Sequence, residues 1–205
     1  MSGTLRLGIM GGTFDPVHYG HLVTAEEALA QFDLDRVVFM PTGQPQTKRH
    51  PVVTSGQDRY LMTVIATASN PGFTVSSLEV DRPGPTYTVD TIRDLRRIHG
   101  ADADFYFITG ADAVWEILQW KDAEELARLT RFIAATRPGF DLSRFSAELS
   151  GMSGAPRVEL MEVPALAISS TDIRARVGAG RPVRYLLPEP VAAYVRKNGL
   201  YREAR

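Results

Sequence analysis

Two of the four histidines of this sequence stand three residues apart in the stretch GGTFDPVHYGH, which covers residues 11–21. The glycine pair Gly11 and Gly12 leaves backbone amides open to a phosphate, and the N-terminus of a following helix attracts anions. His18 and His21 can lie on one side of the first helical turn, where both rings can donate hydrogen bonds to an anion. The spacing is therefore compatible with a phosphate-binding loop.

The same residues allow other interpretations. Glycines after a strand often make only a turn, and this pair does not match the spacing GxGxxG. One histidine could cap the helix while the other lies on the surface, or both could join Asp15 in a metal site. A further metal ligand is not evident nearby, so we expect no metal site in the protein itself.

A second cluster of polar residues covers 168–174 and reads ISSTDIR. Hydroxyl and carboxylate side chains before a helix satisfy its first backbone amides, so capping alone accounts for the Ser-Ser-Thr-Asp run. Capping gives no reason for Arg174, a cation in the first turn, where the helix dipole disfavours positive charge. A bound phosphate would supply that reason, because the Arg174 side chain leans back towards the helix N-terminus.

Two further residues have types that suit a nucleotide site. Lys48 lies in a polar loop after the second predicted strand, at the same edge of a parallel sheet as the 11–21 loop. Trp120 follows Ile117 and Leu118 near a predicted helix end, where a large ring is usually part of the core and could otherwise stack on a flat ligand. Neither residue alone defines a function.

The elements that must position these residues alternate along the chain. Short apolar runs predict strands over 5–10, 36–40, 73–80, 105–109, 132–136 and 158–163. Apolar residues at helical spacing predict helices over 20–32, 60–68, 89–98, 123–129, 171–177 and 191–197. This alternation indicates an α/β, Rossmann-like fold, with a mostly parallel sheet and helices on both faces. Ligands bind at the carboxyl ends of such strands.

The second predicted helix illustrates the basis of these assignments. Ser55, with Asp58 three residues later, resembles a helix-capping box, so the helix is expected to begin there. Its apolar residues then repeat at helical spacing. The expected buried face consists of Tyr60, Leu61, Val64, Ile65 and Ala68.

Composition limits the class of protein. The 205 residues suit a single domain over 1–205 with a core of its own. A formal net charge of -1 gives no general attraction to nucleic acid or membrane, so neither is expected as a partner. The chain has no cysteine and shows neither a signal peptide nor a membrane span, so we expect a cytoplasmic protein. The sequence is compatible with a homo-oligomer but defines no oligomeric state.

The segments 11–22 and 168–174 resemble the HxGH and SSTxIR motifs of the nucleotidyltransferase superfamily, in the form found in bacterial nicotinate-nucleotide adenylyltransferases. Four other segments are similar to the same family: PTYTVDTI at 85–92, FITGADAVWEILQW at 107–120, TRPGF at 136–140 and YLLPEPVAAYVRKNGLY at 185–201. One loop departs from it. Residues 41–48 keep Pro45 and Lys48 but lack the Pro-His pair of the usual PxxxPPHK pattern, so the resemblance does not define the path of this loop.

The resemblance implies transfer of AMP from ATP to the 5′-phosphate of nicotinate mononucleotide, with release of pyrophosphate, as a step of NAD synthesis. It implies ATP, brought with Mg²⁺, and nicotinate mononucleotide as partners. The catalytic residues that it implies are His18, His21, Lys48 and Arg174. The implied ATP-binding residues are Gly11, Gly12, Thr13, Phe14, His18, His21, Gly110, Asp112, Ile168, Ser169, Ser170, Thr171 and Arg174. The implied acceptor-binding residues are Lys48, Thr86, Tyr87, Thr88, Trp120 and Arg137.

An acceptor phosphate is already an anionic nucleophile, so such a reaction needs positioning and charge neutralisation rather than a general base. Two other functions remain open. One is an adenylyltransferase that prefers nicotinamide mononucleotide or another phosphorylated acceptor, such as phosphopantetheine. The other is a nucleotide sensor that binds the phosphates and catalyses nothing.

Overall fold

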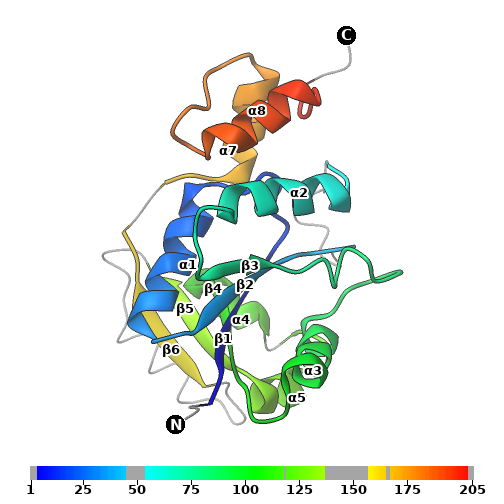
Figure 1. The fold of residues 1–205 in the computed structure, drawn as a ribbon, viewed down its shortest axis with the longest axis vertical. Helices are drawn as coiled ribbons and strands as arrows, with labels where there is room; N and C mark the ends of the chain where they lie inside the picture. Colours follow the sequence, from blue (N-terminus) through cyan, green and yellow to red (C-terminus); the bar gives the residue numbers. More distant parts are fainter. Residues whose placement is uncertain (1–3, 45–53, 118, 137–156, 165–166, 203–205) are drawn as a thin grey trace. The chain divides into compact units, whose positions relative to one another are not determined.

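A computed structural model describes residues 4–44, 54–117, 119–136, 157–164 and 167–202 of the chain (Figure 1). Two predicted site residues, Lys48 and Arg137, lie outside the described residues. Within the described residues, none of the helices is long and apolar enough to cross a membrane.

Six strands form one sheet in the order β3-β2-β1-β4-β5-β6. Their bounds are Arg6–Gly12 (β1), Arg36–Pro41 (β2), Phe73–Val75 (β3), Asp104–Gly110 (β4), Arg131–Thr136 (β5) and Val158–Glu162 (β6). The pairs β1 with β4, β4 with β5 and β5 with β6 are parallel, and Phe107 of β4 is aligned with Ile9 and with Phe132. The predicted Rossmann-like α/β fold is confirmed.

The bounds of the helices are Tyr19–Gln31 (α1), Gly56–Thr67 (α2), Thr88–His99 (α3), Ala111–Ile117 (α4), Ala123–Leu129 (α5), Ser170–Gly178 (α7) and Glu189–Lys197 (α8). Helices and strands alternate from β1 to β4, after which α4 and α5 precede β5, and α7 and α8 follow β6 (labels in Figure 1). α4 directly follows β4; the sequence predicts a helix end near Trp120 but no bounds for that helix, because seven residues are too few for helical periodicity to stand out from a buried strand.

By its internal contacts the chain divides into two compact units. The first unit comprises Met1–Met10, Thr24–Val37 and Tyr87–Ala165, and the second comprises Gly11–Val23, Val38–Thr86 and Leu166–Arg205. Three of the five boundaries fall inside β1, α1 and β2, so each of these elements contributes residues to both units. The expectation of a single domain over 1–205 stays a prediction.

Within the first unit, residues of β4 point alternately to two faces of the sheet, and helical segments cover both. The Arg96 guanidinium of α3 lies 5.8 Å from the ring centroid of Phe105 on one face. Tyr106 points to the other face, where the Arg6 guanidinium lies 5.3 Å from its ring centroid. Arg6 also donates a hydrogen bond of 2.9 Å to the carbonyl of Phe32, directly after α1.

The third strand is shorter than predicted. It ends at Val75, whereas the sequence predicts a strand over 73–80. The Ser76 amide still donates to the Phe39 carbonyl of β2, but the Ser76 hydroxyl then accepts a hydrogen bond from the Leu78 amide. A serine that bonds to the backbone two residues on favours a turn over a continued strand.

The predicted buried face of α2 is wrong. The buried residues are Arg59, Met62, Thr63, Ala66 and Thr67, whereas Leu61 and Ala68 of the expected face are exposed. The two threonines can be buried because their hydroxyls donate to carbonyls one helical turn earlier, at 2.8 and 2.9 Å. Arg59 is buried by hydrogen bonds of a different kind, which are described below.

Candidate active site

The loop after β1 belongs to the second unit and forms the base of the candidate site. Gly11 and Gly12 are the last two residues of β1, and the Gly12 carbonyl accepts a hydrogen bond of 2.9 Å from the Thr42 amide. Phe14 follows with a φ of 50° and an almost completely buried side chain. Its ring packs edge-on against the His21 ring, with centroids 5.0 Å apart, and lies 5.7 Å from Phe39. Phe14 therefore packs between the His21 ring and the Phe39 ring and helps to fix the position of His21.

His18 and His21 meet at the start of α1. Their rings are stacked, with centroids 3.7 Å apart and planes 21° from parallel. The His18 amide donates a hydrogen bond of 3.2 Å to Nδ1 of His21, so His21 satisfies one of the first amides of the helix. The interpretation of a capping histidine is confirmed for His21. The accompanying surface histidine is wrong, because only 6% of His18 is exposed.

Both imidazoles are held in the neutral form by their surroundings. Burial lowers the pKa of His18 to about 4. Burial and the neighbouring His18 hold the pKa of His21 well below its usual value. Nδ1 of His21 accepts a hydrogen bond, and Nδ1 of His18 is buried without a partner among the described residues. The His21 ring therefore carries its proton on Nε2, where it can donate to a ligand, and a neutral His18 can carry its proton on Nε2 as well.

The second predicted cluster forms the N-terminus of α7, also in the second unit. The Ser169 hydroxyl accepts a hydrogen bond of 3.1 Å from the Asp172 amide, so the predicted cap is confirmed. The Ser170 hydroxyl donates instead to the Pro16 carbonyl at 2.8 Å. Arg174 donates from Nη1 to the Asp15 carbonyl at 2.8 Å. Two side chains of α7 are therefore bonded directly to the loop that precedes the histidines.

These two clusters line one pocket of about 400 Å³, which we call the histidine pocket. Its lining residues are Thr13, Phe14, Asp15, His18, His21, Ile168, Ser169, Ser170, Thr171 and Arg174. Nine of these ten were assigned to the ATP site from sequence, and Asp15 is the addition. The described residues contain no group of three His, Cys, Asp or Glu side chains that could hold a metal ion. The available donors are the histidine Nε2–H groups, amides at the start of α7 and the remaining N–H groups of Arg174, which already donates to the Asp15 carbonyl and the Thr171 hydroxyl.

Several predicted nucleotide residues lie in the first unit. Gly110 is the exposed last residue of β4, and Asp112 belongs to α4. Trp120 is half-buried, with its ring edge-on to Phe107 at a centroid distance of 5.6 Å. This packing leaves part of the indole accessible to a ligand.

The start of α3 and the segment after α4 are joined by Lys121, which the sequence did not single out. Its ammonium lies 4.6 Å from the ring centroid of Tyr87, the residue before α3, and 3.0 Å from Oδ2 of Asp90. Tyr87 and Thr88 are thereby linked to the residue next to Trp120. Thr86 belongs to the second unit, where it is buried and its amide donates to the Gln44 carbonyl at 3.4 Å.

Two other residues of the second unit support the histidine pocket from outside and were missed in the sequence. The Tyr201 hydroxyl donates a hydrogen bond of 2.7 Å to Oδ1 of Asp15, and burial raises the pKa of this tyrosine. Arg59 donates to the Thr13 carbonyl at 2.8 Å. Tyr201 falls within the family-like segment 185–201, but the sequence assigned a role to neither residue, because each acts on a loop that is distant in sequence.

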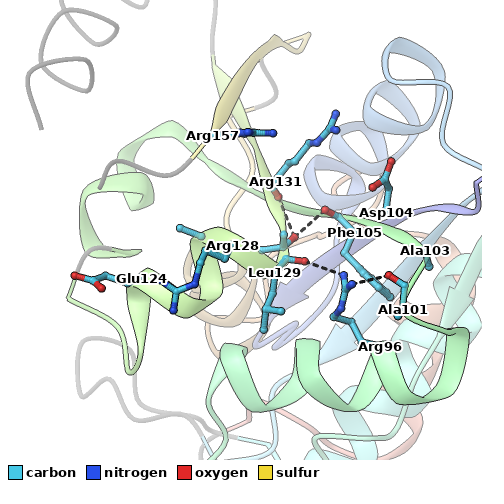
Figure 2. Close-up of a pocket in the computed structure, with 12 residues that line it drawn as sticks. Arg96, Ala101, Ala103, Asp104, Phe105, Glu124, Arg128, Leu129, Arg131 and Arg157 are labelled. Carbon is cyan, nitrogen blue, oxygen red and sulfur yellow. Dashed lines mark hydrogen bonds between the residues drawn. The ribbon is translucent and has the colours of Figure 1, made fainter. Parts of the chain in front are cut away.

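A larger pocket of about 710 Å³ lies in the first unit, where β4 and β5 begin (Figure 2). We call it the amino-end pocket; it is lined by Arg96, Ala101, Ala103, Asp104, Phe105, Glu124, Ala127, Arg128, Leu129, Thr130, Arg131 and Arg157. Arg96 donates to the carbonyls of Ala101 and Leu129, and Figure 2 shows Arg128 and Arg131 pointing to different sides. Because ligands of parallel sheets bind at the carboxyl ends of strands, this pocket is not the candidate active site.

Comparison with known proteins places the sequence in a family. A family model described as cytidylyltransferase-like matches residues 9–176. Probable nicotinate-nucleotide adenylyltransferases from Clavibacter michiganensis and Streptomyces coelicolor are 59% and 58% identical to this chain. The alignments cover 97% and 94% of this chain, and 94% and 99% of those proteins.

Solved structures agree in fold. The nicotinic acid mononucleotide adenylyltransferase of Plasmodium falciparum, complexed with NaAD, superposes with a TM-score of 0.78 at 20% identity, over 96% of this chain and 97% of that one. Two observations lead to one assignment. The chain is 58–59% identical to these relatives over nearly its full length, and residues of both motifs line the histidine pocket. The chain belongs to the cytidylyltransferase-like family and, within it, to the nicotinate-nucleotide adenylyltransferases, which are nucleotidyltransferases.

Proposed function

We propose that this protein transfers AMP from ATP to nicotinate mononucleotide, which yields nicotinate adenine dinucleotide and pyrophosphate. The observation that carries the proposal is the histidine pocket, where two neutral imidazoles and the first turn of α7 with Arg174 surround one cavity. These donors suit a triphosphate, because it presents oxygens along its whole length. The reaction would take place in the cytoplasm, the compartment that the cysteine-free sequence suits.

The chemistry is a displacement at the α-phosphorus of ATP. An oxygen of the acceptor 5′-phosphate attacks, the bond to the bridging α–β oxygen breaks, and pyrophosphate leaves with that electron pair. The acceptor oxygen is already deprotonated at neutral pH, so no side chain needs to remove a proton. The work of the protein is to align the two phosphates and to neutralise the charge on the leaving group.

The donors of the pocket divide this work. His18 and His21 donate from Nε2 to phosphate oxygens near the reacting phosphorus, in the form that their lowered pKa values maintain. Arg174 and the amides of residues 169–171 bind the β- and γ-phosphates at the N-terminus of α7. Lys48 would contact the transferred phosphoryl group. Mg²⁺ arrives as part of the substrate MgATP, bound to its phosphate oxygens.

The nucleoside parts would bind to residues assigned from the family motifs. Ile168 would contact the adenine, and Gly110 and Asp112 the ribose. Trp120 would stack on the pyridine ring, with its indole held edge-on by Phe107. The acceptor side would also include Thr86, Tyr87, Thr88 and Arg137, and backbone amides near Trp120 would select the carboxylate over the amide.

Pyrophosphate release tests this function. The wild-type chain is incubated with ATP and Mg²⁺ and, in parallel reactions, nicotinate mononucleotide, nicotinamide mononucleotide or phosphopantetheine. We expect the highest kcat/KM with nicotinate mononucleotide, and a product with the mass of the nicotinate dinucleotide. A higher kcat/KM with either other acceptor would overturn the substrate assignment. Binding of ATP without release in any reaction would identify a nucleotide sensor instead.

A further inference from the structure

α2 carries an arginine that is almost completely enclosed by protein. Only 1% of Arg59 is exposed, and its guanidinium makes three hydrogen bonds, all to backbone carbonyls. Nη1 donates to Thr13 at 2.8 Å, Nη2 to Gly43 at 3.1 Å and Nε to Thr54 at 3.3 Å. All four residues belong to the second unit. A planar guanidinium is the side chain that can bond to three separate carbonyls in a fixed arrangement.

Each of the three carbonyls lies in or next to a segment that contains residues assigned to the proposed reaction. Thr13 lies in the loop between β1 and the two histidines, and it lines the histidine pocket. Gly43 and Thr54 stand on either side of residues 45–53 in the sequence, the segment that includes Lys48. One side chain therefore bonds to the histidine loop and to both segments that flank the predicted lysine loop.

The surroundings explain how a positive charge can stay buried there. Asp15, which is 2% exposed, and Glu79, which is 8% exposed, both interact electrostatically with the Arg59 guanidinium. Gly43 is confined as well, because a Cβ on this residue would lie 2.0 Å from the Glu79 carbonyl oxygen. A side chain at position 43 would therefore displace the backbone that carries one of the three carbonyls.

We propose that Arg59 is a positioning residue for adenylyl transfer, which fixes the histidine loop relative to the two segments that flank residues 45–53. This inference rests on the proposed function. Arg59 does not touch substrate: it acts through the backbone of Thr13 on the side chains that do. An apolar side chain of similar length would be cheaper to bury but could hold none of the three carbonyls.

The test compares Arg59→Lys with Arg6→Lys. Arg6 is a matched control because it is half-buried and also donates to a backbone carbonyl, but it belongs to the first unit. Lysine keeps the charge at either position and loses the planar fork. For Arg59→Lys we expect kcat/KM for ATP to fall about a hundredfold, with the KM for the acceptor unchanged. For Arg6→Lys we expect both values to stay near those of the wild-type chain.

Two further readouts separate positioning from loss of folding. Amide hydrogen exchange should become faster over residues 11–18 in Arg59→Lys and stay unchanged over β5, which belongs to the other unit. In Arg59→Ala, added guanidinium ion should restore part of the lost activity, and methylammonium should not, because only guanidinium is planar.

Several outcomes would overturn the inference. These are activity of Arg59→Lys within roughly threefold of wild type, unchanged exchange over residues 11–18, or an equal loss in Arg6→Lys. The exchange measurement needs no substrate. If the wild-type chain released no pyrophosphate, the proposed function would be wrong. Amide hydrogen exchange would still show whether Arg59 fixes the position of the loop.

Discussion

Size and number of arginines would both favour the amino-end pocket as the phosphate site, but the structure favours the histidine pocket. The amino-end pocket is larger, at about 710 against 400 Å³, and four arginines line it. Arg96 is occupied by two carbonyls, and Arg131 lies 5.5 Å from the ring centroid of Tyr106. The histidine pocket instead offers Nε2–H groups for which no partner is evident among the described residues. Donors kept available at a helix N-terminus, rather than arginines in number, indicate a site for phosphate.

The largest effect is expected from the histidine that both caps the helix and faces the pocket. His21→Ala should lower kcat by about two to three orders of magnitude, as loss of a preorganised donor does. The control is His99→Ala, because His99 is exposed and its ring lies 6.5 Å from Phe105 of the amino-end pocket. Steady-state pyrophosphate release measures both variants. Equal losses would remove the distinction between the two pockets.

A smaller effect is expected from a methyl group placed beside His18. A Cβ on Gly20 would lie 3.0 Å from Nδ1 and Cε1 of the His18 ring, so Gly20→Ala should displace this ring. We expect kcat to fall about tenfold, while helix propensity keeps the melting temperature equal or raises it. Gly178→Ala in α7 is the control, because its nearest contact would be an ordinary 3.4 Å. A loss of stability without loss of kcat in Gly20→Ala would contradict the expectation.

The buried histidine should also make stability depend on pH. The pKa of His18 is about 4 in the folded protein and near 6.5 in the unfolded chain, so only the unfolded chain gains this proton as the pH falls between these values. Its contribution to stability is present above pH 6.5 and lost towards pH 4, by about 2–3 kcal/mol. Urea titrations across this range should show a smaller decline for His18→Leu. An identical decline in the variant would mean that other groups carry it.

The smallest effect is expected in the amino-end pocket. Arg128→Gln combined with Arg157→Gln removes two of its four arginines, both exposed. We expect kcat/KM for both substrates, and the binding of inorganic tripolyphosphate measured by calorimetry, to stay within about twofold of wild type. A loss of tripolyphosphate binding in this variant would assign an anion site to the amino-end pocket and overturn the contrast drawn above.

Much of the fold and of the histidine pocket could be predicted because the signals are local. Apolar runs at regular intervals predicted the strands. The two family motifs assigned His21 and Arg174 to the same site. The buried face of α2 could not be predicted from apolar periodicity, because Arg59 and Thr63 are buried by hydrogen bonds rather than by apolar surface. The role of Tyr201 could not be predicted either, because its hydrogen-bond partner Asp15 is 186 residues away.

These long separations also determine when the site can be completed during synthesis. The loop at 11–21 is made well before the residues that bond to it, because its hydrogen bonds to Ser170, Arg174 and Tyr201 span 154, 159 and 186 residues. Domains fold as units once their chain is available, and contacts of long sequence separation form late. A nascent chain that ends before Tyr201 therefore has its histidines but lacks the support of the loop that holds them. Adenylyl transfer is expected to begin only after Tyr201 has been made.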